Sequence, residues 1–273
     1  MKRDATLSEI EEFALPGGTA HSGLVTRRGG TVRRPAGTYT PAVHALLGHL
    51  ADQGFTGAPR PLGTDGDTEI LTYLEGESAY LPGLPGAIPE PGWAMTDQAM
   101  VSVARLLRRF HDASGSFDPS GLPWQRPVPA GWAGPRITHN DTHPANVIFR
   151  DGEATGLIDF DLAGPGTVGF ELAVAACFWV PIRAERDISD ARRSRLWERF
   201  RMFLDGYGAS AETRAEVVQA LGAANEWIFG IIREAAERGH PAFVRMWAER
   251  SDMAGRAVSF VQTHEAELKA AAH

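Results

Sequence analysis

The segment from Arg136 to Ala173 constrains the fold of this chain more than any other. It holds two short apolar runs, residues 146–149 and 154–158, with an Asp-Gly pair between them at 151 and 152. An Asp-Gly pair in this setting is the strongest short-range signal for a β-hairpin. Because a hairpin brings the outer ends of its two strands together, we expect Asn146 and Asp159 to lie close to one another.

Three polar residues of this segment predict its chemistry. Asp141 precedes the hairpin by a few residues, Asn146 opens it, and Asp159 follows it. Carboxylate and amide oxygens suit Mg²⁺, which keeps several waters and is usually completed by substrate phosphates. In phosphoryl transfer one Asp accepts a hydroxyl proton, while an Asn and a second Asp hold metal. The spacing therefore predicts Asp141 as a catalytic base, with Asn146 and Asp159 as metal ligands.

The pattern His139-x-Asp141-x4-Asn146, followed by Ile-Asp159-Phe, resembles the catalytic segment of the aminoglycoside phosphotransferase and choline kinase family, a branch of the protein-kinase-like fold. The resemblance implies a two-lobed α+β fold, with a small antiparallel-sheet N-lobe (1–75) and a mainly helical C-lobe (76–273). It also implies ATP and Mg²⁺ as cofactors, a small hydroxylated acceptor, and a bracing role for His139. At Glu171 the chain departs from the family, which usually has Asp before Leu-Ala.

Two other interpretations stay open. His139, Asp141 and His143 alternate along an extended segment and could point the same way as a hydrolytic zinc site, although that leaves Asn146 and Asp159 without a role. A kinase-like module that binds nucleotide or ligand without turnover is the other alternative. It is suggested by the absence of the lysine and glutamate that kinase-like proteins usually carry in the N-lobe.

The N-terminal third predicts a nucleotide-binding sheet. Strands are expected at 10–15, 23–28 and 30–34, and the Gly-bearing loop between the first two would bring Gly18 and Ser22 close to phosphates. Only Lys2 and Lys269 are lysines among the 27 basic residues. Arg33 stands where the resemblance implies a phosphate-binding lysine, with Arg34 competing for the same role. Arginine can hold phosphate in a fork.

The segment that follows predicts a helix and a hinge. A helix should begin at Thr40, which is a good N-cap, with Pro41 at its first position. No glutamate occurs between Glu12 and Glu69, so the usual partner of the strand lysine must be replaced, and His44 is a candidate. By the resemblance, backbone groups around Tyr73 and Leu74 would meet adenine.

The rest of the chain predicts helices, and the resemblance implies that the acceptor rests on them. They are expected from residue 96 to about 112 and at 170–179, 189–207, 211–237 and 241–270, with a kink allowed in each of the last two. By the resemblance, Glu226, Glu234 and Asp252 are candidate acceptor contacts. The acceptor itself stays open: an aminoglycoside, another antibiotic, an amino alcohol, a sugar or a nucleoside would fit, and GTP could replace ATP.

Composition excludes several other classes. Hydrophobic residues make up 43% of the chain and charged residues 22%, and the longest apolar run is too short to cross a bilayer. A net charge of −7 without basic runs argues against nucleic acid. One cysteine, Cys177, and an N-terminus without an apolar signal-peptide core predict a cytoplasmic protein. We expect a monomer or homodimer without a membrane partner.

Overall fold

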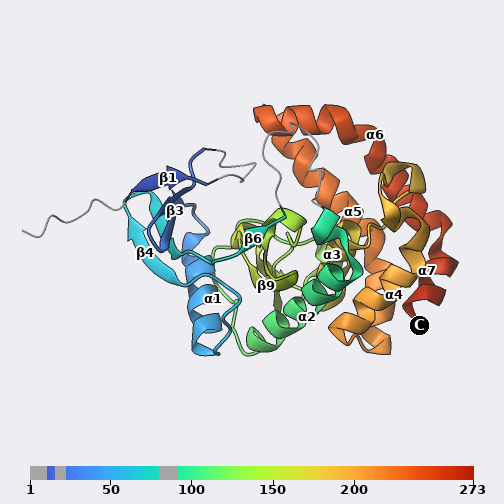
Figure 1. Cartoon of the computed structure of the whole chain (residues 1–273), viewed down its shortest axis with the longest axis horizontal. Coiled ribbons are helices and arrows are strands. Elements are labelled where there is room, and N and C mark those ends of the chain that lie inside the picture. Colours follow the sequence, from blue (N-terminus) through green and yellow to red (C-terminus); the bar gives the residue numbers. More distant parts are fainter. Residues whose placement is uncertain (1–10, 16–22, 80–91) are drawn as a thin grey trace, which may run out of the picture.

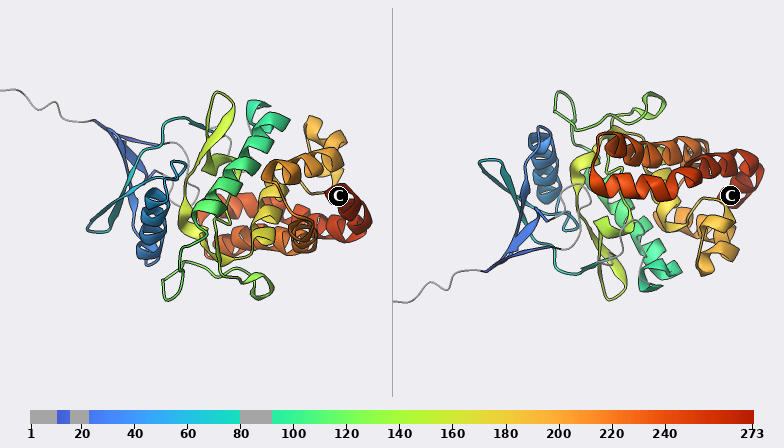
Figure 2. Two further views of the ribbon diagram at one scale, coloured as in Figure 1. Left: turned by 90° about the horizontal axis from the view of Figure 1, so that it is seen from below. Right: turned by 90° about the horizontal axis from the view of Figure 1, so that it is seen from above.

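The computed structural model of the protein describes residues 11–15, 23–79 and 92–273. A small sheet with one helix lies at one end of the long axis, and a group of helices lies at the other (Figure 1). Two further views keep this separation, with the catalytic hairpin between the two ends (Figure 2). The arrangement confirms the predicted two-lobed α+β fold.

The small lobe is built on an antiparallel sheet with the strand order β1-β2-β3-β5-β4. Gly29 and Gly66, both with positive φ, close the β2–β3 and β4–β5 turns. The antiparallel ladder between β3 and β5 places Arg34 directly opposite Glu69. The strands are β1 (Glu12–Ala14), β2 (Thr26–Arg28), β3 (Thr31–Pro35), β4 (Pro61–Asp65) and β5 (Thr68–Thr72).

Helix α1 (Thr40–Asp52) packs beside this sheet and buries the expected apolar face, which includes Leu46, Leu47 and Leu50. The capping prediction was wrong by one residue. Tyr39 occupies the N-cap without a side-chain cap, and Thr40 is the first helical residue. Instead of capping the helix, the Thr40 hydroxyl accepts a hydrogen bond from the Gly37 backbone N–H at 2.9 Å, which fixes the turn leading into α1.

The predicted hairpin is present as β8 (Val147–Arg150) and β9 (Glu153–Leu157), with β6 (Glu77–Ser78) pairing alongside β8. Asp151 and Gly152 both adopt positive φ, as the tight Asp-Gly turn requires. At the open end, the Ile158 N–H donates to the Asn146 carbonyl at 3.0 Å. We propose the lobe boundary at 75/76, because β5 belongs to the first sheet and β6 to the second.

Helices make up most of the second lobe, and their apolar faces form a continuous core. They are α2 (Asp97–Ala113), α3 (Val168–Trp179), α4 (Leu196–Tyr207), α5 (Ala211–Glu237), α6 (Pro241–Thr263) and α7 (Glu265–Ala272). One predicted boundary was wrong, because residues 191–195 form a 3₁₀ turn before α4. The final helix, in which a kink was allowed, divides at His264 into α6 and α7. No helix among the described residues is long and apolar enough to span a membrane.

Candidate active site

Asp141 and Asn146 are joined directly at the mouth of the hairpin. The Asn146 amide donates to the Asp141 carboxylate at 2.9 Å and to the Asp141 carbonyl at 3.0 Å. Burial raises the pKa of Asp141 well above its usual value, and the negative charge of Asp159 raises it further. The loop thus holds the Asp141 carboxylate in a fixed orientation, hydrogen-bonded to the Asn146 side chain.

Asp159 lies immediately after β9, in a left-handed backbone conformation with φ 62°. Arg34 reaches it from β3: Nη1 donates to Asp159 Oδ1 at 2.8 Å, while Nη2 donates to Asp161 Oδ1 at 2.7 Å. Although burial favours the neutral form, the charge and hydrogen bond of Arg34 lower the pKa of Asp159. Burial, followed by the charge of Asp159, raises the pKa of Asp161 to about 6.

Arg33 lies outside this cluster, so the sequence prediction chose the wrong face of β3. Its Nη2 donates to Asp65 Oδ2 at 2.8 Å, and that carboxylate is 73% exposed. Alternate residues of a strand point to opposite faces. Arg34 therefore shares the face of Val32, which lines the cleft described below, whereas Arg33 points away from it. Because side chains alternate along a strand, the apolar Val32 could have indicated that Arg34, two residues later, faces the cleft.

The missing helix glutamate is replaced from an adjacent strand. Glu69 on β5 is almost fully buried and accepts from Arg34 Nε at 2.5 Å. His44, the candidate from α1, does not contact Arg34 in its own right. Its Nε2 lies 2.9 Å from Glu69 Oε1, close enough for an ion pair but not aligned for a hydrogen bond. Sequence reasoning missed Glu69 because it searched a helix and not the neighbouring strand.

The departure at Glu171 is accommodated by a buried brace. One Glu171 oxygen accepts from the His139 backbone N–H at 2.9 Å, and the other lies 2.5 Å from Nε2 of His111. His139 is fully buried, and its Nε2 lies 3.0 Å from the Ile158 carbonyl. Both side chains therefore hold the catalytic loop to its surroundings, and His139 presents no ring nitrogen to solvent.

The predicted nucleotide contacts are only partly within the described residues. Gly18 and Ser22 lie outside them. Tyr73 and Leu74 follow β5 and line the same cleft as Asp141. The Tyr73 N–H donates to the Gly30 carbonyl at 2.8 Å, and the Arg27 guanidinium lies 3.6 Å from the centre of the Tyr73 ring. Apolar side chains from both lobes cover this part of the cleft, including Val25, Val32, Leu71, Ile148 and Ile158.

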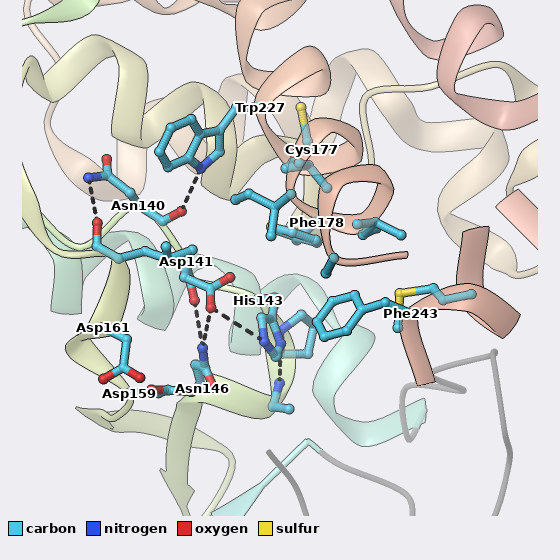
Figure 3. A pocket seen from close by; sticks show the side chains of 18 of the residues that line it. Asn140, Asp141, His143, Asn146, Asp159, Asp161, Cys177, Phe178, Trp227 and Phe243 are labelled. Carbon is cyan, nitrogen blue, oxygen red and sulfur yellow. Dashed lines mark hydrogen bonds and ion pairs between the residues drawn. The ribbon is translucent and has the colours of Figure 1, made fainter. Parts of the chain in front are cut away.

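A single cleft of about 2160 Å³ connects these groups with α5 and α6. It exceeds the volume of about 300–1,000 Å³ that is usual for one small ligand, so it has room for a nucleotide and an acceptor together. Figure 3 shows Asp141, Asn146, Asp159 and His143 around its centre, with Trp227, Phe178 and Phe243 on the helical side. Glu226 and Glu234 line it, as expected, but Asp252 does not.

Trp227 connects the helical wall to the catalytic loop. Its indole N–H donates to the Asn140 carbonyl at 3.3 Å, next to Asp141. Arg126 lies over the same ring, 5.0 Å from its centre, and donates to Glu234 at 2.6 Å. This wall therefore bears aromatic surface together with a cation and an anion that already bind each other.

The donor set favours magnesium over zinc. Within the described part of the chain, no group of three or more His, Cys, Asp or Glu residues could hold a metal. His139 is turned toward Ile158, so the rival site built on His139, Asp141 and His143 is not assembled. Asn146 and Asp159 both line the cleft, and their side-chain oxygens are of the kind that could hold Mg²⁺ completed by water and phosphate.

Comparison with known proteins identifies the class. Residues 122–209, which contain the hairpin and the whole catalytic segment, match the model of the phosphotransferase enzyme family. The structure resembles that of a choline/ethanolamine kinase family protein from Mesorhizobium loti, with a TM-score of 0.61 at 15% identity over 95% of this chain and 92% of that one. The fold is therefore that of the protein-kinase-like small-molecule phosphotransferases.

Two sequence relatives extend the match. The chain is 34% identical over 248 residues to the trifolitoxin immunity protein of Rhizobium leguminosarum bv. trifolii, covering 86% of each protein. It is 26% identical over 175 residues to a homoserine kinase of Granulibacter bethesdensis, covering 49% of this chain and 51% of that one. The chain belongs to the phosphotransferase enzyme family.

Proposed function

We propose that the protein transfers the γ-phosphoryl group of ATP to a hydroxyl of a small molecule held between the catalytic loop and helices α5 and α6. The proposal rests on one observation: Asp141, Asn146 and Asp159 meet at one end of the β8–β9 hairpin and line the same cleft. Phosphoryl transfer needs positioning and electrostatic stabilisation more than covalent help from the protein.

Asp141 is assigned the role of base. It takes the proton of the acceptor hydroxyl while the hydroxyl oxygen bonds to the γ-phosphorus. The bond from that phosphorus to the bridging oxygen breaks, and its electron pair leaves with ADP. The Asn146 amide holds the Asp141 carboxylate at 2.9 Å, and the Glu171 brace fixes the preceding loop at His139. These contacts orient the carboxylate before the acceptor arrives.

Asn146 and Asp159 are assigned to magnesium, which neutralises phosphate charge when bound. Arg34 binds Oδ1 of Asp159, whose side chain is 35% exposed and lines the cleft. Arg34 takes the role of phosphate clamp that the sequence assigned to Arg33. It lies between Asp159 and the sheet. Each of its Nη atoms keeps one N–H beyond those donated to Asp159 and Asp161, and a phosphate oxygen can accept from it.

The acceptor belongs among small hydroxylated compounds. Because the trifolitoxin immunity protein is similar over most of this chain, antibiotics and toxins with hydroxyl groups are acceptors to test first. Aminoglycosides, amino alcohols, sugars, nucleosides and homoserine complete the panel.

The proposal is tested by two measurements on one preparation. Mg·ATP should raise the melting temperature, because a ligand that binds only the folded state stabilises it. Incubation with the acceptor panel, analysed by mass, should give a product heavier by one phosphoryl group, and GTP is run in parallel. No thermal shift at millimolar Mg·ATP would reject the nucleotide site. A shift without transfer or ATP hydrolysis would favour the alternative of a binding module.

A further inference from the structure

His143 carries a hydrogen-bond donor next to the proposed base. Its Nδ1 accepts the Ala145 backbone N–H at 3.2 Å, so that nitrogen carries no proton. An imidazole whose Nδ1 accepts a hydrogen bond is in its neutral form. A neutral imidazole with an acceptor at Nδ1 has its proton at Nε2. The Nε2–H is thus fixed by the local backbone.

No described residue accepts that proton. The nearest carboxylate oxygen, Asp141 Oδ2, lies 3.8 Å from Nε2, which is too far for a hydrogen bond. The His143 side chain is 23% exposed and lines the cleft. One face of its ring packs against Phe178 of α3, with ring centres 5.9 Å apart. The donor is therefore held in place but unused, beside the atom that would take the acceptor's proton.

The donor faces the acceptor part of the cleft. In Figure 3, Asp159 and Asp161 lie on one side of Asn146, while His143 lies on the other with Phe178 and Phe243. Arg34, the proposed phosphate clamp, binds Asp159 and Asp161 on the first side. A group that meets His143 Nε2 therefore approaches from the helices and not from the small sheet.

We propose that His143 binds a second oxygen of the acceptor, on the carbon next to the hydroxyl that is phosphorylated. Oxygens on adjacent carbons in a gauche arrangement lie about one hydrogen-bond length apart. One can therefore donate to Asp141 while the other accepts from His143 across the 3.8 Å that separates these two groups. The inference rests on the proposed function and narrows its acceptor to vicinal diols, as in sugars and polyols, or to 2-hydroxy acids. Amino alcohols with a single oxygen lack the second contact.

The test compares pairs of acceptors that differ by that one oxygen. Suitable pairs are cis-cyclohexane-1,2-diol with cyclohexanol, glycerol with propane-1,3-diol, and methyl glucoside with its deoxy analogues. We expect kcat/KM to favour the first member by about tenfold, the usual effect of one hydrogen bond. In His143→Phe this ratio should fall to about one. His143→Gln, which restores an N–H donor, should recover part of it.

A second histidine-to-phenylalanine substitution, at His264, serves as the control for His143→Phe. His264 stacks on Phe260, far from the catalytic loop, and His264→Phe should keep the wild-type ratio. Circular dichroism and the melting temperature verify that each variant folds. If His143→Phe does not fold, His143→Leu takes its place. The kcat/KM ratio within each acceptor pair is then compared between His143→Gln and His143→Leu.

Three results would overturn the inference. Equal use of both members of every pair by the wild type would show that the second oxygen is not bound. A loss of turnover in His143→Phe that is the same for both members, together with loss of ATP hydrolysis, would place His143 on the γ-phosphoryl group. Transfer to no acceptor at all would reject the proposed function and this inference with it, whereas the first two results leave phosphoryl transfer intact.

Discussion

The two ends of the cleft are built in different ways. On the sheet side, Arg34 binds Glu69, Asp159 and Asp161, and Tyr39 donates to Asp161 at 2.7 Å, so the charges form a closed network. On the helical side, Arg126 and Glu234 bind each other and Nε2 of His143 is unused among the described residues. A closed network suits a ligand that is always the same, whereas a wall of aromatic surface with available donors suits acceptors that differ between relatives.

The largest effect is expected from substitutions of Asp141 and Asp159, which lie between the sheet side and the helical side of the cleft. Asp141→Asn should lower kcat by about a hundredfold or more while leaving Mg·ATP affinity nearly unchanged, because a general base contributes about 10²–10⁴. Asp159→Asn should instead weaken metal-dependent nucleotide binding, since it removes a charged metal ligand. Turnover and nucleotide titration on both variants measure the contrast. The opposite assignment would follow if Asp141→Asn lost ATP binding and Asp159→Asn kept it.

The next prediction concerns the ionic network on the sheet side of the cleft. Arg34→Ala leaves buried Glu69 without its cation and should cost about 3–5 kcal/mol of folding free energy, besides weakening nucleotide binding. Arg33→Ala is the matched control. Its exposed pair with Asp65 is worth less than about 1 kcal/mol. Urea unfolding and ATP titration compare the two, and a larger effect at Arg33 would refute the assignment of faces on β3.

A smaller effect, on folding stability, is expected from Glu171, which braces the catalytic loop. Glu171→Ala removes the acceptor for two buried groups, the His139 N–H and the His111 ring, and should destabilise the protein by about 2–3 kcal/mol. Glu171→Gln should cost less, because its oxygen can still accept from His139. Unfolding curves provide the comparison. Equal costs for both variants would mean that the bond to His139 contributes nothing.

The last prediction involves no substitution and tests whether the helical side is closed and apolar around Cys177. Burial raises the pKa of Cys177 to about 12. At pH 8 its thiolate fraction is then about 10⁻⁴, against roughly a quarter for a free cysteine with a pKa near 8.5. Iodoacetamide should therefore label the folded protein about 10³-fold more slowly than a free thiol, faster as pH rises, and at the ordinary rate in urea. Rapid labelling of the folded protein would show that this wall opens.

The sequence was most informative where chemistry depends on local spacing. The Asp-Gly turn sufficed to predict that Asn146 and Asp159 meet, because hairpin geometry leaves few alternatives. The choice between Arg33 and Arg34 required the side-chain period of β3, and an error of one residue reverses the face. Glu69 could not be assigned from the spacing along the chain, since its pairing with Arg34 depends on which strands neighbour each other.

Residues that act through the fold were the least predictable. Glu171 was recognised as a departure, but its two bonds depend on how α3 packs against the catalytic loop and α2. His143 was weighed only as a zinc ligand. Its available Nε2 follows from a backbone contact to Ala145 that no motif encodes. Long-range packing therefore limits prediction here more than secondary structure does.

The strand position of Glu69 has a consequence for control of the enzyme. Protein kinases are switched by moving the helix that carries the glutamate partner of their lysine. Here that partner sits on β5, directly across a hydrogen-bonded ladder from Arg34, and α1 contributes only His44. Movement of α1 would leave the ion pair intact, so we expect that a shift of this helix does not switch the enzyme off.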